Sequence, residues 1–306
     1  MASTLVTGGA GFVGSHIADS FLHRGDKVLV VDDLTTGKLQ NIPNGVEFHQ
    51  VGIQSTQFTE SVRAFQPDII VHAAAQASVA VSISDPKLDA GINIIGSINV
   101  AQAARDVQCK QLIYITTGGA LYGEPKYVPS DEKHPIQPVS GYGLSKWTVE
   151  RYLAIMLPAT IDLKILRLAN VYGPRQDPKG EAGVVAIFAA AMVEGMQITI
   201  DGDGNQTRDF VFVADVARAV SLVAETQGPI VANVGTGRGT SINDLARHMG
   251  SLLDGETNSV RGASRQGDIR NVALDSTHAK QVFGWEPTVS LPEGLAITIG
   301  YFSKDC

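Results

Sequence analysis

The chain has 306 residues, and 44% of them are apolar, which is enough for one large domain or two smaller ones around a substantial core. Its formal net charge of −7 gives no general attraction to phosphate polymers or anionic lipid, so we expect neither nucleic acid nor a membrane as a partner. Two cysteines far apart, Cys109 and Cys306, offer neither a disulfide framework nor the spacing of a zinc site, and we expect no metal.

The opening segment MASTLVTGGAGFVG lacks the basic and long apolar regions of a secretory signal. No stretch of the chain reaches the roughly 18 apolar residues of a membrane span. We therefore expect a cytoplasmic protein.

Short β-branched runs alternate with longer amphipathic stretches through the first 170 residues. This rhythm predicts an α/β fold, a doubly wound parallel sheet of the Rossmann type, with strands beginning near residues 3, 27, 46, 68, 111 and 162. Apolar residues at helical spacing predict a helix over 92–107. A second helix is predicted from Ser140, as its N-cap, to a stop at Pro158.

The composition changes after Arg167, where ANVYGPRQDPKGEAG is rich in Gly, Pro and charge and is typical of a loop across the mouth of the sheet. We place a boundary near residue 170. The prediction is a dinucleotide-binding domain over 1–170, to which 209–234 returns, and a smaller mixed α/β lobe over 171–306 that binds the substrate.

Three glycines, Gly8, Gly11 and Gly14, follow the first predicted strand and open a helix. Without side chains they let the backbone approach a pyrophosphate, whose charge then lies on the N–H groups and positive dipole end of that helix. Tight packing of strand on helix is the alternative explanation, because the spacing alone is a weak signal.

Two acids, Asp32 and Asp33, end the second strand about 20 residues after the glycines, where a carboxylate can accept hydrogen bonds from the adenosine ribose. A carboxylate there repels a 2′-phosphate, and the only nearby cation is Lys38, so NAD is favoured over NADP. The alternative for Asp33 is a solvated loop acid.

Tyr142 and Lys146 lie four residues apart near the start of the second predicted helix, so both side chains emerge on one face. An ammonium beside a phenol favours the phenolate, and an oxidised nicotinamide adds to that effect, so Tyr142 can act as a base. The fifth strand ends in Thr116 and Thr117, at the sheet edge where doubly wound folds bind ligands, and one of these hydroxyls can bridge the sugar oxygen and the phenol.

Taken together, TGGAGFVGSH, the Asp32 pair, HAAAQASV, TTGGALYG, Tyr142-x-x-x-Lys146 and LRLANVYGPR resemble the extended short-chain dehydrogenase/reductase family over essentially the whole chain. The later motifs GDGNQTRDFVFVADVARAV and RQGDIRNVALD are most similar to its UDP-glucose 4-epimerase group. The resemblance implies a tightly held NAD, a UDP-sugar bound under the second lobe, a catalytic trio of Thr117, Tyr142 and Lys146, and a homodimer built from the helices near 92–107 and 140–157.

The resemblance also implies two sets of ligand contacts. The NAD contacts come from Gly8, Gly11, Phe12, Val13, Gly14, Asp32, Asp33, Leu34, Thr36, Gly37, Gly52, Ile53, Ala73, Ala74, Ala75, Gln76, Asn93, Thr116, Tyr142, Lys146 and Ala169. The substrate contacts come from Ser78, Thr117, Tyr142, Asn170, Val185, Thr199, Arg208, Arg265 and Asp268. Salt bridges that stabilise the second lobe are the alternative role for Arg208, Arg265 and Asp268.

Gly118 and Gly119 follow the catalytic hydroxyl, where relatives that dehydrate or decarboxylate nucleotide sugars carry acids. Without a carboxyl group there, the simplest reaction is reversible oxidation at sugar C4: Tyr142 takes the hydroxyl proton, NAD takes the hydride, and the 4-keto sugar receives it back on its other face. We therefore predict interconversion of UDP-glucose and UDP-galactose, with the N-acetylhexosamine pair as a further possibility.

Several alternatives stay open at this point. Uronic-acid epimerases typically have Thr in place of Asn170 and Arg in place of Asp177, and the acid here favours a neutral hexose. Two further alternatives are an NAD-dependent oxidoreductase of nucleotide sugars that exchanges its cofactor, and an NAD-sensing protein without enzymatic activity. Gly52 stands where relatives usually carry an Asp that binds the adenine. Gly118 and Gly119 leave the choice between Thr116 and Thr117 as the catalytic hydroxyl open. Ala80 and Asp201 replace residues that are common around the substrate, which leaves the identity of its base and sugar open.

Overall fold

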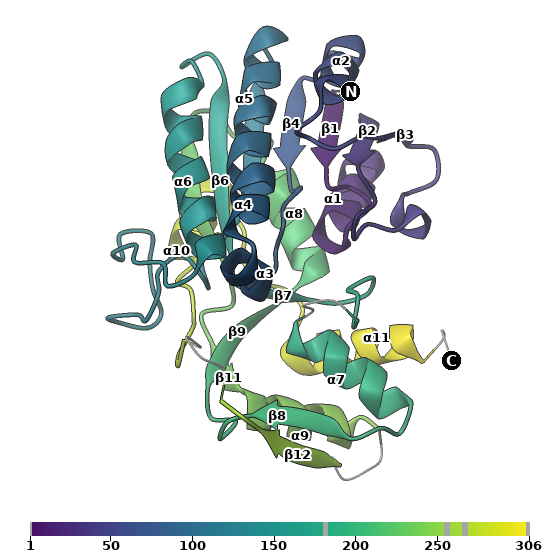
Figure 1. Ribbon diagram of the computed structural model, residues 1–306, viewed down its shortest axis with the longest axis vertical. Coiled ribbons are helices and arrows are strands. Elements are labelled where there is room, and N and C mark those ends of the chain that lie inside the picture. The colour runs from purple at the N-terminus through teal and green to yellow at the C-terminus, as the bar shows by residue number, and fades with distance from the viewer. Residues whose placement is uncertain (1, 180–182, 254–257, 265–268, 304–306) are drawn as a thin grey trace.

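The structure is a computed structural model that describes residues 2–179, 183–253, 258–264 and 269–303 (Figure 1). Its larger lobe is built on one sheet of seven parallel strands in the order β10-β6-β5-β4-β1-β2-β3. The strands are β1 (Ser3–Thr7), β2 (Lys27–Asp32), β3 (Glu47–Gln50), β4 (Ile69–His72), β5 (Gln111–Thr117), β6 (Asp162–Leu168) and β10 (Ile230–Val234). The doubly wound parallel sheet and the six strand positions predicted from the sequence are confirmed.

Both faces of the sheet are buried, which is why its strands are rich in Val, Ile and Leu rather than alternating with polar residues. Successive residues of β1 point to opposite faces, so Leu5 and Val6 belong to different clusters of core side chains. One face is covered by α1 (Phe12–His23), α8 (Val213–Val223) and α10 (Thr277–Phe283). The other face is covered by α2 (Thr56–Phe65), α5 (Gly96–Asp106) and α6 (Gly141–Met156).

The helix predicted over 92–107 begins differently from the prediction. The chain after β4 runs through α3 (Val79–Ser84), α4 (Pro86–Asp89) and a π-helix, η2 (Ala90–Ile95), before α5 begins at Gly96. A π-helix has no signature in apolar periodicity, and such turns are often found at functional sites. The second predicted helix is confirmed, since the Ser140 hydroxyl caps α6 by accepting a hydrogen bond from the Gly143 amide at 3.1 Å.

Within the described residues, the smaller lobe contains two small sheets and three helices. One sheet joins β7 (Asn170–Tyr172), β9 (Thr207–Phe212) and β11 (Gly239–Ser241), and the other joins β8 (Ile198–Asp201) and β12 (Ser259–Gly262). With α7 (Val184–Val193), α9 (Ile242–Ser251) and α11 (Leu291–Phe302), they enclose a separate apolar core. The carboxyl ends of the large-sheet strands face this lobe (Figure 1).

The chain reverses direction across the sheet between β1 and β4, because β2 and β3 lie on one side of β1 while β4, β5, β6 and β10 lie on the other. In doubly wound folds, ligands bind at the carboxyl ends of the strands beside such a reversal. The fold therefore points to the loops after β1, β2, β4 and β5. No helix in the described ranges is both long and apolar enough to cross a membrane.

Candidate active site

The glycine loop between β1 and α1 is formed by close backbone packing. Gly8 has a positive φ of 69°, and a Cβ there would lie 2.7 Å from the Ala74 Cα; a Cβ on Gly14 would lie 2.1 Å from the Gly8 carbonyl oxygen. Gly11 caps α1 without a side-chain hydrogen bond, and no acidic residue occupies the first turn of that helix. The N–H groups of the first turn are thus left for an anion, and nothing negative competes with a pyrophosphate.

The two acids after β2 have different positions. Asp32 is buried and accepts hydrogen bonds from the amides of Ala10, at 3.0 Å, and Leu34, at 2.8 Å. Burial raises its pKa, and these backbone N–H groups oppose that rise. Asp33 is exposed, and a Cβ on Gly52 would lie 3.7 Å from its Oδ2. Asp32 therefore fixes the glycine loop, whereas Asp33 presents an accessible carboxylate beside Gly52.

Other predicted cofactor contacts gather around these loops. Leu34 has a positive φ of 62°, and a Cβ on Gly37 would lie 2.7 Å from Asp32 Oδ1. The Ile53 side chain is buried against Gly96, and its carbonyl accepts a hydrogen bond from Asn99 at 3.0 Å. Phe12 and Val13 are partly exposed in the first turn of α1, Thr36 is exposed, and Ala73, Ala74 and Ala75 follow β4 beside Gly8.

A buried chain of hydrogen bonds joins β1, β4 and the helices beyond. His72 Nδ1 lies 2.8 Å from Thr7 Oγ1, and its Nε2 lies 2.8 Å from Ser97 Oγ. Thr7 Oγ1 accepts from the Ala74 amide at 3.2 Å, and Ser97 donates to the Asn93 carbonyl. Because Ser97 donates to Asn93, His72 Nε2 donates to Ser97 Oγ. Burial lowers the pKa of His72 to about 3, so the ring is neutral and Nδ1 accepts from Thr7.

The predicted catalytic pair, Tyr142 and Lys146, lies on α6 against the end of β5. Lys146 is buried, and its Nζ donates a hydrogen bond to the Ile115 carbonyl at 3.1 Å and lies 4.8 Å from the Tyr114 ring centroid. Burial lowers the pKa of Lys146 to about 8, while Asp89 and Glu150 act in the opposite direction. Burial, and then Asp89, raise the pKa of Tyr142 above its ordinary value. The protein alone therefore opposes the phenolate, so its formation calls for the positive charge of an oxidised nicotinamide.

The two threonines that end β5 differ in their partners. Thr116 is buried, and its Oγ1 has no hydrogen-bond partner among the described residues. Thr117 is partly exposed and accepts a hydrogen bond from the Ala120 amide at 3.2 Å. The buried Thr116 hydroxyl lies beside that of Tyr114, whereas Thr117 presents the more accessible hydroxyl.

The predicted substrate contacts spread over both lobes. A Cβ on Gly119 would lie 3.8 Å from Asn170 Oδ1 and 3.9 Å from Thr117 Oγ1, so Thr117 and Asn170 flank the same glycine. Ser78 uses its hydroxyl to cap α3, accepting from the Val81 amide at 2.8 Å. The Val185 side chain is buried in the small-lobe core, which leaves its backbone for any substrate contact, and Thr199 is exposed on β8. Ala169, a predicted cofactor contact, is buried at the end of β6.

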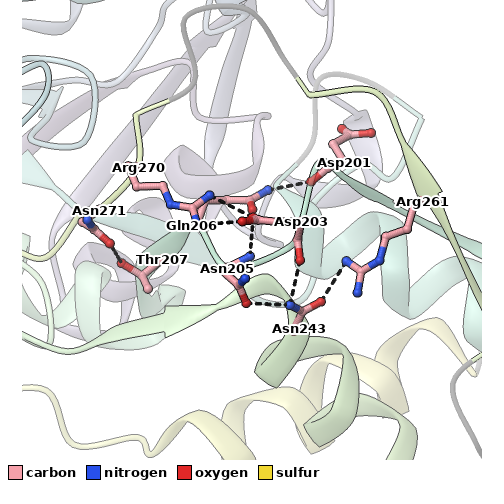
Figure 2. Close-up of polar contacts among 9 residues, drawn as sticks. All are labelled: Asp201, Asp203, Asn205, Gln206, Thr207, Asn243, Arg261, Arg270 and Asn271. Atoms are coloured by element: carbon pink, nitrogen blue, oxygen red, sulfur yellow. Dashed lines mark hydrogen bonds and ion pairs between the residues drawn. The ribbon is translucent and has the colours of Figure 1, made fainter.

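Arg208 lies on β9 and donates hydrogen bonds to the carbonyl oxygens of Thr207 and Ile269, each at 2.8 Å. Figure 2 shows the polar network around this strand. Arg270 donates two hydrogen bonds of 2.8 Å to the Asp203 carboxylate, and Asn243 donates to the Asp203 carbonyl at 3.0 Å. This network fixes the turn before β9 and the segment beside it. The other two predicted substrate contacts, Arg265 and Asp268, lie outside the described residues.

Sequence reasoning missed one part of the site. Asp89 is 2% exposed and accepts hydrogen bonds from Gln76, Asn93 and Ser145, so it joins two predicted cofactor contacts to the catalytic helix. The sequence shows only an acidic residue in the short segment DPKLD. From the sequence alone, Asp89 cannot be told apart from an acid that caps a helix, such as Asp85. Asn93 is four residues away, but Gln76 and Ser145 are 13 and 56 residues away, so this set of contacts was not predictable from the sequence.

The sheet, the acid-free glycine loop, the Asp32 and Asp33 pair and the Tyr142–Lys146 pair define a nicotinamide-dinucleotide-binding protein of the extended short-chain dehydrogenase/reductase type. A family model described as the NAD dependent epimerase/dehydratase family matches residues 4–235. The chain therefore belongs to this family.

Individual relatives agree over the full length. A UDP-glucose 4-epimerase of Mycolicibacterium smegmatis is 40% identical over 306 residues, which cover 98% of each chain. The crystal structure of a UDP-glucose 4-epimerase from Thermotoga maritima with UDP-glucose is 43% identical, with a TM-score of 0.96 over 99% of both chains. A UDP-glucose 4-epimerase of Thermus thermophilus in complex with NAD is 39% identical, with a TM-score of 0.93 over 98% of both chains.

Proposed function

We propose that the chain is an NAD-dependent UDP-glucose 4-epimerase, an isomerase that interconverts UDP-glucose and UDP-galactose. The observation that carries the proposal is the catalytic pair on α6: Lys146 is buried against the end of β5, and Tyr142 lies one helical turn before it, at the same sheet edge as the glycine loop. The relatives reported above, which match end to end at about 40% identity and include complexes with UDP-glucose and NAD, support the same reaction.

The protein's own residues handle the proton. Tyr142 accepts the proton of the C4 hydroxyl and returns it to the 4-keto sugar, and Lys146 stabilises the phenolate by its charge. Thr117 hydrogen-bonds to the C4 oxygen, since it is the more accessible of the two hydroxyls. Bound NAD supplies the hydride acceptor. Because the same hydride returns to the opposite face of the sugar, the reaction has no net redox change.

We assign the two ligands to the two lobes. The large lobe, built on the seven-stranded sheet, holds NAD through the glycine loop, Asp33 and Thr116. The small lobe, together with Asn170, holds the UDP-sugar. We assign Arg208, on β9, to the diphosphate. Asp177 forms an ion pair with Lys38 at 3.5 Å, so its charge is not left to repel a sugar carboxylate. The preference for a neutral hexose over a uronic acid is instead supported by the relatives reported above. The cytoplasmic location stays a prediction from the sequence.

We also propose a homodimer. Apolar side chains on the outward face of α6 are exposed: Leu144 by 55%, Tyr152 by 42% and Ile155 by 78%. Ile95, at the end of η2, is exposed by 59%. The helices η2 and α6 are in contact. Exposed apolar side chains on neighbouring helices are of the kind that a second copy of the chain covers in a symmetric dimer.

The test of the activity is incubation of the purified protein with UDP-galactose or UDP-glucose, without added NAD, followed by proton NMR of the anomeric signals. An epimerase that retains its cofactor converts each sugar into a mixture of both. Oxidised or reduced sugar that forms only after free NAD or NADH is added would instead identify an oxidoreductase.

A further inference from the structure

Asp89 stands out among the buried titratable groups because nothing in the reaction described above uses it. It lies at the end of α4, is 2% exposed, and belongs to no ion pair within the described part of the chain. Its Oδ1 accepts hydrogen bonds from Gln76 Nε2 at 2.8 Å and Asn93 Nδ2 at 2.9 Å, and its Oδ2 accepts one from Ser145 Oγ. A buried carboxylate held only by neutral donors keeps its charge uncompensated unless a cation lies nearby.

Asp89 acts electrostatically on a cation of the catalytic helix, because burial lowers the pKa of Lys146 and Asp89 raises it. Ser145, which donates to Asp89, directly precedes Lys146 in the chain, and both are buried in α6. The other acid near Lys146 is Glu150, but Arg167 already neutralises it with two hydrogen bonds of 3.1 and 2.7 Å. Asp89 is therefore the acid whose charge is left to balance Lys146.

The remaining groups that face the pair carry no charge. Tyr114, on β5, is buried with a hydroxyl that lacks a partner among the described residues, and it lies under the Lys146 ammonium. His72, on β4, is stacked on Tyr114 and is neutral. The charge at the start of α6 is thus set by Asp89, Lys146 and Tyr142 until the cofactor binds.

The backbone around Asp89 is also unusual. The π-helix η2 begins directly after it and contains Asn93, which donates to Asp89 and to the Gln76 carbonyl, while the Gln76 amide donates to Asn93 at 2.9 Å. The π-helix places Asp89 and Asn93 so that one closed set of hydrogen bonds joins the loop after β4 to α6.

We infer that Asp89 is a positioning residue for the proposed epimerase: its buried carboxylate ties the cofactor loop at Gln76 and Asn93 to the catalytic helix at Ser145, and its charge sets the protonation of the Tyr142–Lys146 pair. This inference rests on the proposed function. Asp89 does not touch the reacting atoms; it acts through the helix and through the electric field at the pair.

The charge of Asp89 can be removed with little change in shape. In Asp89→Asn, the side-chain oxygen can still accept from Gln76 and Asn93, and the new amide can donate to Ser145 Oγ, which then acts as the acceptor. Ser145→Ala is the matched control, because it removes one hydrogen bond to Asp89 and leaves the charge in place. Asp89→Ser is also neutral, and it repeats the test if Asp89→Asn does not fold.

The direction of the effect follows from the sign of the charge. An anion disfavours loss of a proton from both Tyr142 and Lys146, so its removal lowers both pKa values. The active pair has a deprotonated tyrosine and a protonated lysine, which makes the pH profile of kcat/KM bell-shaped. Both limbs of this profile should move to lower pH in Asp89→Asn, by about half a pH unit or more. Both limbs should stay in place in Ser145→Ala, whatever its loss in kcat.

A second readout is independent of turnover. Tyrosine labelled with ¹³C at the ζ position, with the Tyr142 signal identified from Tyr142→Phe, reports the titration of this phenol by NMR in the NAD-bound protein. The titration midpoint should be lower in Asp89→Asn than in the wild type. The inference would be overturned if the limbs of the pH profile and the Tyr142 titration midpoint were unchanged in Asp89→Asn. It would also be overturned if Ser145→Ala shifted them equally. If the wild type does not epimerise, the proposed function fails, but the titration still decides the role of Asp89.

Discussion

At the scale of single residues, the pKa values of the proposed catalytic pair, Tyr142 and Lys146, shift in opposite directions. Burial lowers the pKa of Lys146 to about 8 and raises that of Tyr142, so both pKa values shift towards the neutral forms. At neutral pH Lys146 therefore stays mostly protonated, and Tyr142 stays a neutral phenol. The proposed mechanism needs the phenolate, so we expect the pKa of Tyr142 to be lower in the protein with oxidised NAD than in the protein alone.

Tyr142→Phe removes the phenolic hydroxyl and leaves the aromatic ring. We expect kcat to fall by about 10³-fold or more, because general base catalysis typically contributes 10² to 10⁴, while the Kd for NAD stays within about twofold. Steady-state epimerisation and fluorescence titration with NAD measure the two quantities. A variant that keeps a tenth of the wild-type kcat would remove Tyr142 from the mechanism.

The pH dependence of stability tests the buried hydrogen-bond chain at His72. The folded-state pKa is about 3, well below the ordinary value of 6.5, so His72 stabilises the fold above pH 6.5 and this contribution is lost as the pH falls towards 3. The free energy of unfolding should fall by about 1.4 kcal/mol for each pH unit below pH 6 because of this group.

Urea unfolding of the wild type and of His72→Asn between pH 5 and 7 measures that slope. Asn can keep one donor and one acceptor but does not titrate, so the variant should be less stable at pH 7 and show a shallower dependence on pH. Equal slopes in the two proteins would contradict a neutral, hydrogen-bonded His72.

At the scale of secondary-structure elements, the proposed active site depends on where the helices α1 and α6 begin. The glycine loop opens α1, and Ser140 caps α6 only two residues before Tyr142. The glycine array predicted the start of α1 and the Ser140 cap predicted the start of α6, because both signals are local in sequence. The π-helix η2 and the contacts of Asp89 were not predictable, since they depend on the packing of α4 against α6 and the loop after β4.

Ser140→Ala tests the link between the cap and the site. Loss of an N-cap hydrogen bond should lower the free energy of unfolding by about 1 kcal/mol and also reduce kcat, because the first turn of α6 carries Tyr142. Ser241→Ala is the matched control: it removes the cap of α9 in the small lobe and should cost similar stability with unchanged kcat. If both variants kept the wild-type kcat, the cap would have no role in positioning Tyr142.

At the scale of the whole molecule, the seven-stranded sheet and the small lobe at the carboxyl ends of its strands agree with the fold class predicted from the sequence. The proposed substrate residues were predicted less completely. Thr117 and Asn170 meet at Gly119, but Arg208 binds backbone carbonyls and the Val185 side chain is buried in a core. Sequence spacing identifies which residues can reach a ligand and does not show which are already engaged within the protein.

The proposed dimer gives a prediction at the same scale. Ile155→Asp places a charge on the exposed apolar face of α6, so the dimer should dissociate, and light scattering after size exclusion should show a monomer. Val282→Asp is the control, because Val282 is 40% exposed on α10, on the other face of the sheet, and its replacement should leave the dimer intact. A monomeric wild type would refute the dimer.

The central claim is that one hydride leaves C4 of the sugar and returns to it on the opposite face. The most direct measurement uses UDP-galactose with deuterium at C4, together with unlabelled NADH in solution, and analyses the UDP-glucose product by NMR and mass spectrometry. The proposed mechanism predicts that the UDP-glucose product retains the deuterium at C4. Product that has lost the deuterium, or 4-keto sugar that accumulates, would show that the cofactor exchanges during turnover and would contradict it.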